Sequence, residues 1–327
     1  MEFTANYDLG FKEAWNKWNG RWLDETAYDQ VISSIGVKED IIKVYKPFGS
    51  IDEKPLLAVV VKGVYTGEVY NEVKDSLFSI DDLTTMRANA SGPIDHEEMK
   101  KKGLIEGKDY KLRTPNSYYV RTKSGGWGMI AYAAEIHSVM IGYKRGRFTG
   151  AIDVSGWTKD NPEKFEILKE IAVYNEKAFD KANSIVYNKQ RKFAEEYIQS
   201  EHRIGIFTTL SANRYHAGQS AKMSAHIDSG DTEFGMTSMC VFRQGDYQGA
   251  YLLFPRYGIG IDAPDNSVLI ADSREVHGVT SIRGNGERFS CVAYCDNRLA
   301  TIGNAGKSER LIGKYAKKHS GNLEEFI

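Results

Sequence analysis

The chain has 327 residues, of which 41% are hydrophobic and 12% aromatic, enough for one large core or two smaller ones. Its formal net charge of −1 gives no overall attraction for polyanions, and its three cysteines argue against a disulfide framework and favour a reducing compartment. Because no secretory signal or long apolar run is visible, we expect a soluble, intracellular protein, in a bacterial cytoplasm or a nucleus, without a membrane partner.

The N-terminal part of the chain mixes several patterns. Residues 8–35 have apolar residues at helical spacing, whereas residues 37–47 and 55–64 are typical of strands. Residues 80–128 are rich in turn formers and are expected to be irregular, and residues 131–147 again indicate a strand.

The C-terminal part has a more regular pattern of predicted helix and strands. A long amphipathic helix is predicted from Pro162 to Gln199, with a break near Ala182–Asn183. Short strands separated by glycine and proline turns follow, at residues 204–213, 236–242, 250–254, 258–261, 267–272 and 288–294. A long helix followed by many short strands predicts an α+β fold whose core is a double-stranded β-helix, or jelly roll, supported by N-terminal helices and strands.

Three regions are expected along the chain. Residues 1–160 would form an N-terminal elaboration that packs on the core and carries loops able to contact nucleic acid. Residues 161–300 would form the jelly roll with its support helix, and residues 301–327 a helical tail.

Positive charge is concentrated in one segment. Between Lys100 and Gly150 there are eleven basic and three acidic residues. The small-residue loops Ala88–Pro93 and Ser124–Gly128 would let backbone approach a ligand closely. These features predict a phosphate-contacting surface, and the same charges are equally compatible with an ordinary solvated surface on which they are dispersed.

His226 and Asp228 are candidate metal ligands. Side chains alternate along a strand, so two residues that are two positions apart can face one ion. His277, from a later strand, is the candidate third ligand. Two histidines and a carboxylate on one face of an ion leave the opposite face open, which is the arrangement of non-haem Fe(II) oxygenases.

Such a site also needs a cation for the carboxylate of its cosubstrate, and a planar guanidinium binds a carboxylate through two parallel hydrogen bonds. Arg288 lies on a predicted strand shortly after His277, and Ser290 shares its strand face. Asn213 and Tyr215 share a face of an earlier strand and can hydrogen-bond the cosubstrate or line the entrance to its binding site.

These motifs resemble a known superfamily. Residues 204–297 are similar to the 2-oxoglutarate/Fe(II) dioxygenases, and the run 213–218, Asn-Arg-Tyr-His-Ala-Gly, before His226-x-Asp228 resembles the AlkB-like nucleic-acid demethylases. The run 277–280, His-Gly-Val-Thr, followed by Arg288-x-Ser290 and then a tyrosine resembles the TET/JBP group, which oxidises the methyl group of 5-methylpyrimidines in DNA.

The resemblance implies a function and a set of roles. His226, Asp228 and His277 would hold Fe(II), and Arg288 and Ser290 would bind 2-oxoglutarate. With O2 as the second cosubstrate, the enzyme would hydroxylate the methyl group of 5-methylcytosine to 5-hydroxymethylcytosine, with further oxidation as an extension. The expected partner is DNA that contains a 5-methylpyrimidine, and no protein partner is implied.

Candidate substrate contacts follow from the same resemblance. In TET enzymes a Tyr-x-His ends the last strand and its histidine faces the target base, whereas this chain has Tyr294-Cys295-Asp296. The Asp296 carboxylate can accept a hydrogen bond from the exocyclic amine of cytosine, which thymine lacks. Asp231 resembles an acidic base-contacting position, and Arg87 stands in a loop similar to one in this group. Both carboxylates could equally be solvated loop residues.

Two other kinds of function stay open. The same chemistry could act on thymine in DNA, an alkylated base, a small molecule or a protein side chain. The near-neutral net charge favours a small molecule or a protein side chain, whereas the basic segment and the TET-like strand end favour DNA. The alternative from another class is a jelly-roll binding module without catalysis, and the combination of the ligand set with Arg288 argues against it.

Overall fold

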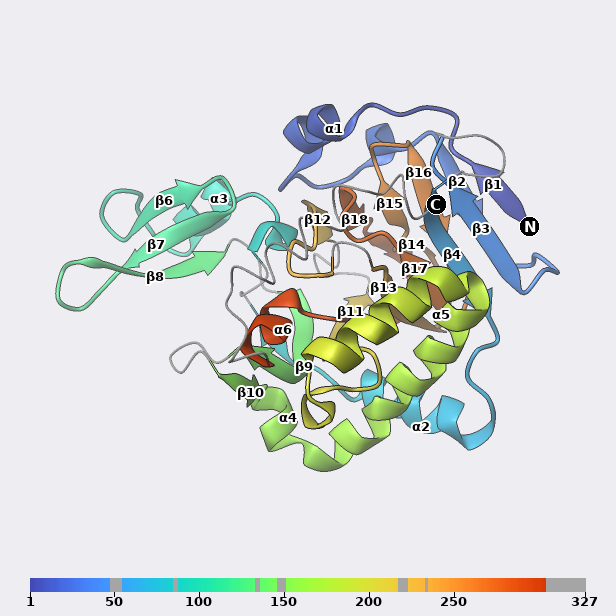
Figure 1. Ribbon diagram of the computed structural model, residues 1–327. Coiled ribbons are helices and arrows are strands. Elements are labelled where there is room, and N and C mark those ends of the chain that lie inside the picture. Colours follow the sequence, from blue (N-terminus) through green and yellow to red (C-terminus); the bar gives the residue numbers. More distant parts are fainter. Residues whose placement is uncertain are drawn as a thin grey trace.

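Two mostly antiparallel sheets form the body of the molecule, with helices along one side and a small arm that projects from the other end (Figure 1). This computed structural model describes residues 1–47, 55–84, 88–132, 136–145, 151–216, 223–232 and 235–303. Of the sequence predictions, Arg87 and most of the expected C-terminal helical tail lie outside these residues.

The larger sheet has the order β1-β3-β4-β17-β13-β20-β11-β9-β10, with β5 paired to β9. Its strands are β1 (Glu2–Thr4), β3 (Ile41–Tyr45), β4 (Leu56–Lys62), β5 (Leu83–Thr84), β9 (Ile136–Arg145), β10 (Ile152–Val154), β11 (Thr209–His216), β13 (Thr237–Gln244), β17 (Ser267–Ala271) and β20 (Glu287–Tyr294). The central strands are buried on both faces, which explains the continuous apolar run of β4. N-terminal and C-terminal strands therefore share one sheet.

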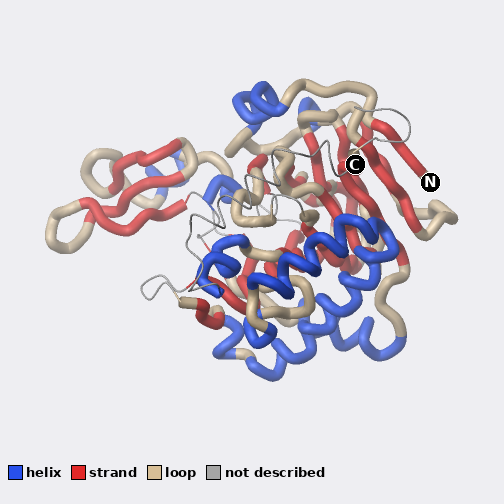
Figure 2. The backbone as a smooth tube through the Cα atoms, viewed as in Figure 1, coloured by secondary structure: helices blue, strands red, loops and turns tan. Residues whose placement is uncertain are grey.

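The smaller sheet has the order β12-β18-β15-β16-β2, and a separate pair joins β14 to β19. Figure 2 shows how the strands, in red, fill the body of the molecule. Its strands, with that pair, are β2 (Gln30–Ser33), β12 (Met223–His226), β14 (Tyr247–Gly249), β15 (Leu252–Phe254), β16 (Ile259–Asp262), β18 (His277–Val279) and β19 (Ile282–Gly284). One hydrophobic cluster joins Met239 and Leu269 of the larger sheet to Leu252 and Phe254 of the smaller one. The two sheets thus enclose a core, as the predicted jelly roll requires.

The long helix α5 (Pro162–Tyr197) packs on the outer face of the larger sheet beside α2 (Gly67–Phe78). Its backbone leaves the helical region at Asn183 (φ −155°, ψ 80°), so the predicted break is confirmed. The remaining helices are α1 (Phe11–Trp18), α3 (His96–Lys101), α4 (Gly156–Asp160) and α6 (Asn297–Gly303), with 3-10 turns η1 (Glu25–Ala27), η2 (Ala88–Ser91) and η3 (Ser200–His202). None of the helices described is long and apolar enough to cross a membrane.

The prediction of a helix across residues 8–35 is only half right. α1 forms its first half, but the second half contains strand β2, which pairs in parallel with β16. Ile32 is buried in that sheet, so pairing with a strand more than 200 residues away overrides the local helical spacing.

The expectation of irregular structure over residues 80–128 is wrong for residues 94–132, which we call the arm. The arm consists of α3 and a three-stranded sheet of β6 (Tyr110–Thr114), β7 (Ser117–Arg121) and β8 (Trp127–Tyr132). Ile94, Met99 and Tyr110 form a small hydrophobic core of its own. The turn-rich sequence reflects short strands joined by tight turns rather than an absence of structure.

Candidate active site

The structure brings His226, Asp228 and His277 together. His226 ends β12 and His277 begins β18, and these two residues are directly paired in the antiparallel ladder. The ligand atoms of the three residues all lie within 4.8 Å of one another. Nε2 of His226 is 3.7 Å from Oδ1 of Asp228, and Nε2 of His277 is 3.6 Å from Oδ2. This spacing suits a single ion held by three ligands.

Backbone carbonyls orient both imidazoles. Nδ1 of His226 lies 2.7 Å from the carbonyl oxygen of Ser224, and Nδ1 of His277 lies 2.9 Å from that of Glu275. Because a carbonyl only accepts, each Nδ1 carries the proton and each Nε2 presents its lone pair to the shared point.

Asp228 lies in the loop after β12 and not on a strand, which differs from the expectation that His226 and Asp228 share a strand face. Its amide donates to the carbonyl oxygen of Ser273 at 2.9 Å, and its own carbonyl accepts from the amide of Asp231 at 3.1 Å. A turn therefore brings the carboxylate beside the histidines. With its side chain 37% exposed, Asp228 lies on the accessible side of the group.

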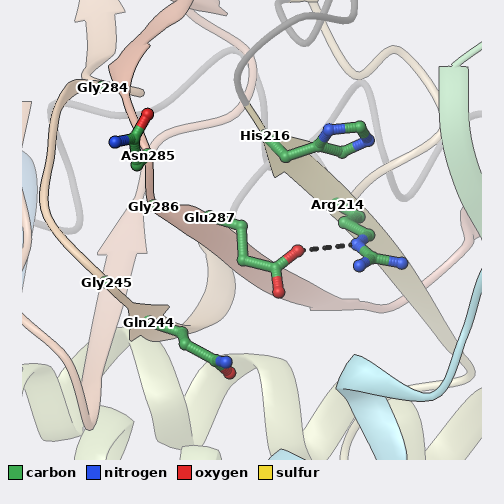
Figure 3. Close-up of a pocket in the computed structure, with 8 residues that line it drawn as sticks. All are labelled: Arg214, His216, Gln244, Gly245, Gly284, Asn285, Gly286 and Glu287. Carbon is green, nitrogen blue, oxygen red and sulfur yellow. Dashed lines mark hydrogen bonds and ion pairs between the residues drawn. The ribbon is translucent and has the colours of Figure 1, made fainter.

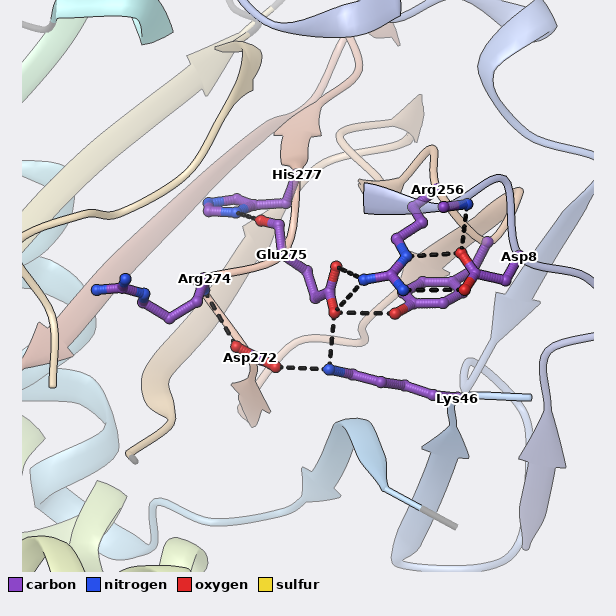
Figure 4. Close-up of polar contacts among 9 residues, drawn as sticks. Asp8, Lys46, Arg256, Asp272, Arg274, Glu275 and His277 are labelled. Atoms are coloured by element: carbon purple, nitrogen blue, oxygen red, sulfur yellow. Dashed lines mark hydrogen bonds and ion pairs between the residues drawn. The ribbon is translucent and has the colours of Figure 1, made fainter. Parts of the chain in front are cut away.

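A buried charge network supports His277 from behind (Figure 4). The carboxylate of Glu275, whose carbonyl holds His277, accepts hydrogen bonds from Lys46 Nζ (2.7 Å), Arg256 Nη1 (2.9 and 3.0 Å) and Tyr257 OH (2.9 Å). Asp272 bonds the same lysine at 2.8 Å, and Asp8 bonds the arginine at 2.6 and 2.9 Å. Burial alone would lower the pKa of the lysine, but its two ion pairs raise it, so the network stays charged.

Replacing Glu275 by glutamine is expected to destabilise the fold by about 3 kcal/mol, because two largely buried cations lose an anionic partner. It should also weaken Fe(II) binding by about 10- to 100-fold, since support behind a ligand carries such effects. Urea unfolding measures the loss of stability, and iron titration measures the loss of Fe(II) affinity. Glu166→Gln breaks an exposed pair with Lys169 and should change stability by less than about 0.5 kcal/mol. Equal stability of both variants would contradict the role given to the network.

Arg288 and Ser290 lie between the sheets on the inner face of β20. They alternate with Phe289, which packs against the helices in the outer cluster. Arg288 is 3% exposed and donates from Nη1 to the carbonyl oxygen of Ala250, while its Nε and the Oγ of Ser290 have no hydrogen-bond partner among the described residues. Unpaired buried polar atoms are costly, so these two point to a ligand that would bond them.

Tyr247 adds a third such group, which sequence reasoning missed. Its buried hydroxyl has no partner in the described part of the chain, and burial raises its pKa to about 12 although the nearby charge of Arg288 opposes the shift. The phenol therefore keeps its proton and can donate. An arginine, a serine and a tyrosine fit the carboxylate of 2-oxoglutarate. The sequence around Tyr247 does not distinguish it from an ordinary strand tyrosine.

Tyr215 and Asn213 lie beside this cluster as the register predicts. Tyr215 pairs with Arg288 and Asn213 with Ser290 across β11 and β20. The Arg288 guanidinium lies 5.5 Å from the Tyr215 ring centre, and the Tyr215 hydroxyl is 3.3 Å from Sδ of Met223. Asn213 accepts from Oγ of Ser138 at 2.6 Å. Tyr215 thus positions the Arg288 guanidinium, whereas the side chain of Asn213 already has a hydrogen-bond partner, Ser138.

The candidate base contacts Asp231 and Asp296 lie in two loops that are joined to each other, which we call the tethered loops. Asp231 pairs with Asp296 in an isolated bridge, and the Asp231 carboxylate accepts from Thr237 and Ser273 hydroxyls at 2.5 and 2.6 Å. Burial, with Asp228 and Asp296 nearby, raises the pKa of Asp231 to about 8.

Both oxygens of Asp296 accept from Arg298 at 2.6 to 3.0 Å. Contact of this carboxylate with cytosine would therefore require Arg298 to move. Tyr294 ends β20 on the same strand face as Arg288 and is partly buried.

A pocket of about 430 Å³ lies apart from this site (Figure 3). Its lining residues are Arg214, His216, Gln244, Gly245, Gly284, Asn285, Gly286 and Glu287. Arg214 and Glu287, which form a 2.9 Å ion pair, alternate with Tyr215 and Arg288 along their strands. The pocket therefore faces away from the space between the sheets.

Comparisons with known proteins find the fold among solved structures. No family model and no curated protein matches the sequence. NgTET1, solved in complex with 5mC DNA, is similar with a TM-score of 0.51 over 88% of this chain and 90% of that chain, at 12% identity. A viral collagen prolyl hydroxylase from Paramecium Bursaria Chlorella virus-1, solved as a 2OG complex, gives 0.34 over 75% and 98%, at 12% identity. A 2OG-Fe(II) oxygenase family oxidoreductase from Burkholderia pseudomallei gives 0.32 over 71% and 92%, at 12% identity.

The likeness to NgTET1 covers most of both chains and concerns the fold. The predicted double-stranded β-helix and the predicted resemblance to TET-like oxygenases are therefore confirmed at that level. The chain shares its fold with NgTET1 and has a His-Asp-His group that could hold a metal ion.

Proposed function

We propose that this chain is a 2-oxoglutarate- and Fe(II)-dependent dioxygenase that hydroxylates the methyl group of 5-methylcytosine in DNA. The observation that carries the proposal is the combination of His226, Asp228 and His277 around one point with the buried Nε of Arg288 and Oγ of Ser290, which have no partner among the described residues of the same jelly roll. The fold shared with NgTET1, whose structure contains 5mC DNA, supports DNA as the substrate.

The roles of the residues follow from their positions. His226, Asp228 and His277 would hold Fe(II), which supplies O2 activation coupled to the decarboxylation of 2-oxoglutarate. Arg288 would pair with the far carboxylate of the cosubstrate, with Ser290 and Tyr247 donating further hydrogen bonds. The apolar core around Leu252 and Phe254 excludes water from the cosubstrate end of the site.

DNA recognition is the part that depends on loops. A methyl group inside a duplex is reached by flipping its base out of the stack, at a cost of a few kcal/mol. The tethered loops that carry Asp231 and Asp296 follow Asp228 and β20, so they lie where an extruded base would meet the iron ligands. Arg298, fixed on Asp296 but with its side chain 57% exposed, supplies a cation at this rim.

Incubation with a duplex that carries one 5-methylcytosine, together with Fe(II), 2-oxoglutarate and ascorbate, should give 5-hydroxymethylcytosine by nucleoside mass spectrometry. Matched duplexes with thymine, an alkylated base or unmodified cytosine at that position test the choice of base. Normal succinate formation without any oxidised base would contradict a DNA substrate and favour a small molecule or protein. Absence of the weak visible band expected on anaerobic addition of Fe(II) and 2-oxoglutarate would favour a non-catalytic module.

A further inference from the structure

The arm has one closed and one open face. Tyr110, Leu112 and Tyr118 point to the closed face, where Ile94 and Met99 pack on them. Lys111, Tyr119 and Arg121 alternate with them and point the other way, to the open face, with Trp127 paired to Arg121 on β8. Arg113 is exposed next to this face, at a bulge in β6.

The open face combines positive charge with aromatic surface. Lys111, Arg113 and Arg121 are exposed, and β6, β7 and β8 contain no aspartate or glutamate. Trp127 is 39% exposed, and the Arg121 guanidinium lies 5.3 Å from its ring centre. α3, on the closed side, offsets its lysines with Glu97 and Glu98. Asp109, just before β6, lies opposite Arg121, and its carboxylate accepts from the Ile105 amide at 3.0 Å. The open face therefore keeps an excess of positive charge on one side of the arm sheet.

The base of the arm is fixed beside the strand that carries His226. Nδ2 of Asn116 donates to the carbonyl oxygen of Gly20 at 2.7 Å, and the Gly20 amide donates to the carbonyl oxygen of Ala225, also at 2.7 Å. Gly92, just before the arm, has φ +78° and packs so tightly on Trp22 that a Cβ there would lie 2.1 Å from the indole. Two hydrogen bonds through Gly20 thus connect the β6–β7 turn to Ala225, the neighbour of His226, and the arm extends away from the body (Figure 1).

We propose that the open face of the arm is a docking surface for the sugar–phosphate backbone of duplex DNA, flanking the site at which a base is oxidised. This inference rests on the proposed function for its choice of polyanion. Three exposed cations beside the single carboxylate of Asp109 suit phosphates, and Tyr119 and Trp127 offer flat apolar surface for the sugars. Docking on one side of the flipping site would hold the duplex in register while the loops after Asp228 receive the base.

The test compares two triple variants with equal charge loss. Lys111→Gln, Arg113→Gln and Arg121→Gln together neutralise the open face, and Lys100→Gln, Lys101→Gln and Lys102→Gln neutralise three lysines at the end of α3 and just after it. Affinity for a fluorescent unmodified duplex is measured without iron or cosubstrate at several salt concentrations. Three lost phosphate contacts should flatten the slope of log K against log salt by about 2.7, whereas the α3 variant should keep the wild-type slope.

The outcomes separate this inference from the proposed function. An unchanged slope in the open-face variant, or an equal change in the α3 variant, would overturn the docking surface even if the wild type oxidises DNA. If both triple variants show the expected salt dependence but the wild type oxidises no DNA, the docking surface is supported and the proposed function is refuted. Binding to polyglutamate but not to DNA would also overturn it in favour of a protein partner. If the triple variant does not fold, Arg121→Gln alone should flatten the slope by about 0.9.

Discussion

Substituting His277 by alanine is expected to remove Fe(II) binding and to lower 2-oxoglutarate turnover by more than about 100-fold. Changes behind a metal ligand already cost 10- to 100-fold, and loss of the ligand itself should cost more. Only His226 and Asp228 would remain near the ion, and the substitution leaves a gap where the Nε2 of His277 now lies 3.6 Å from the carboxylate of Asp228. Iron content after anaerobic reconstitution, together with succinate formation, measures the effect.

The matched control for that variant is His96→Ala. His96 is exposed on α3 of the arm, its Nδ1 lies 3.3 Å from the hydroxyl of Tyr110, and it is not one of the three grouped candidate metal ligands. It should bind iron and turn over 2-oxoglutarate as the wild type does. Full iron content in the His277 variant would remove His277 from the ligand set.

Replacing Arg288 by alanine is expected to raise the Kd for 2-oxoglutarate by 30-fold or more while iron binding persists. Truncating one member of a buried, hydrogen-bonded charge pair costs about 2–5 kcal/mol, and 2 kcal/mol corresponds to about 30-fold. Arg288→Lys keeps the charge but loses the planar fork, so its affinity should be intermediate. Anaerobic titration of the Fe(II) protein with 2-oxoglutarate, followed by the visible band, gives the Kd.

Arg214→Gln is the control for Arg288. Arg214 is on the neighbouring strand, but its guanidinium lies over Phe289 on the opposite face and pairs with Glu287. Its loss should leave the Kd for 2-oxoglutarate unchanged. If Arg288→Ala abolished iron binding and left cosubstrate affinity intact, the role assigned to Arg288 would be wrong.

Residues whose chemistry depends on strand periodicity could be predicted from the sequence. Arg288 and Ser290 are two positions apart on one strand, as are Asn213 and Tyr215, so alternation alone places them on shared faces. The break in α5 at Asn183 was likewise predictable, because the helical span is longer than most helices of globular proteins.

Residues whose role depends on distant contacts could not be predicted. Glu275 meets Lys46 across 229 positions of sequence, and no local pattern indicates that approach. The ion pair of Asp296 with Arg298 could not be predicted either, because an arginine two positions later could equally point to solvent. The arm was missed because its strands are short and its hydrophobic core is small.

The order in which the larger sheet can be completed follows from the place of β20. This strand sits between β13 and β11, both of which precede it in the chain, and it carries Arg288. During synthesis the facing edges of β11 and β13 therefore stay unpaired until residues 287–294 have left the ribosome, a stage at which open edges invite association with other chains. A nascent chain that stops earlier also lacks Arg288, so under the proposed function an unfinished product would not bind 2-oxoglutarate and would not generate oxidant without a substrate.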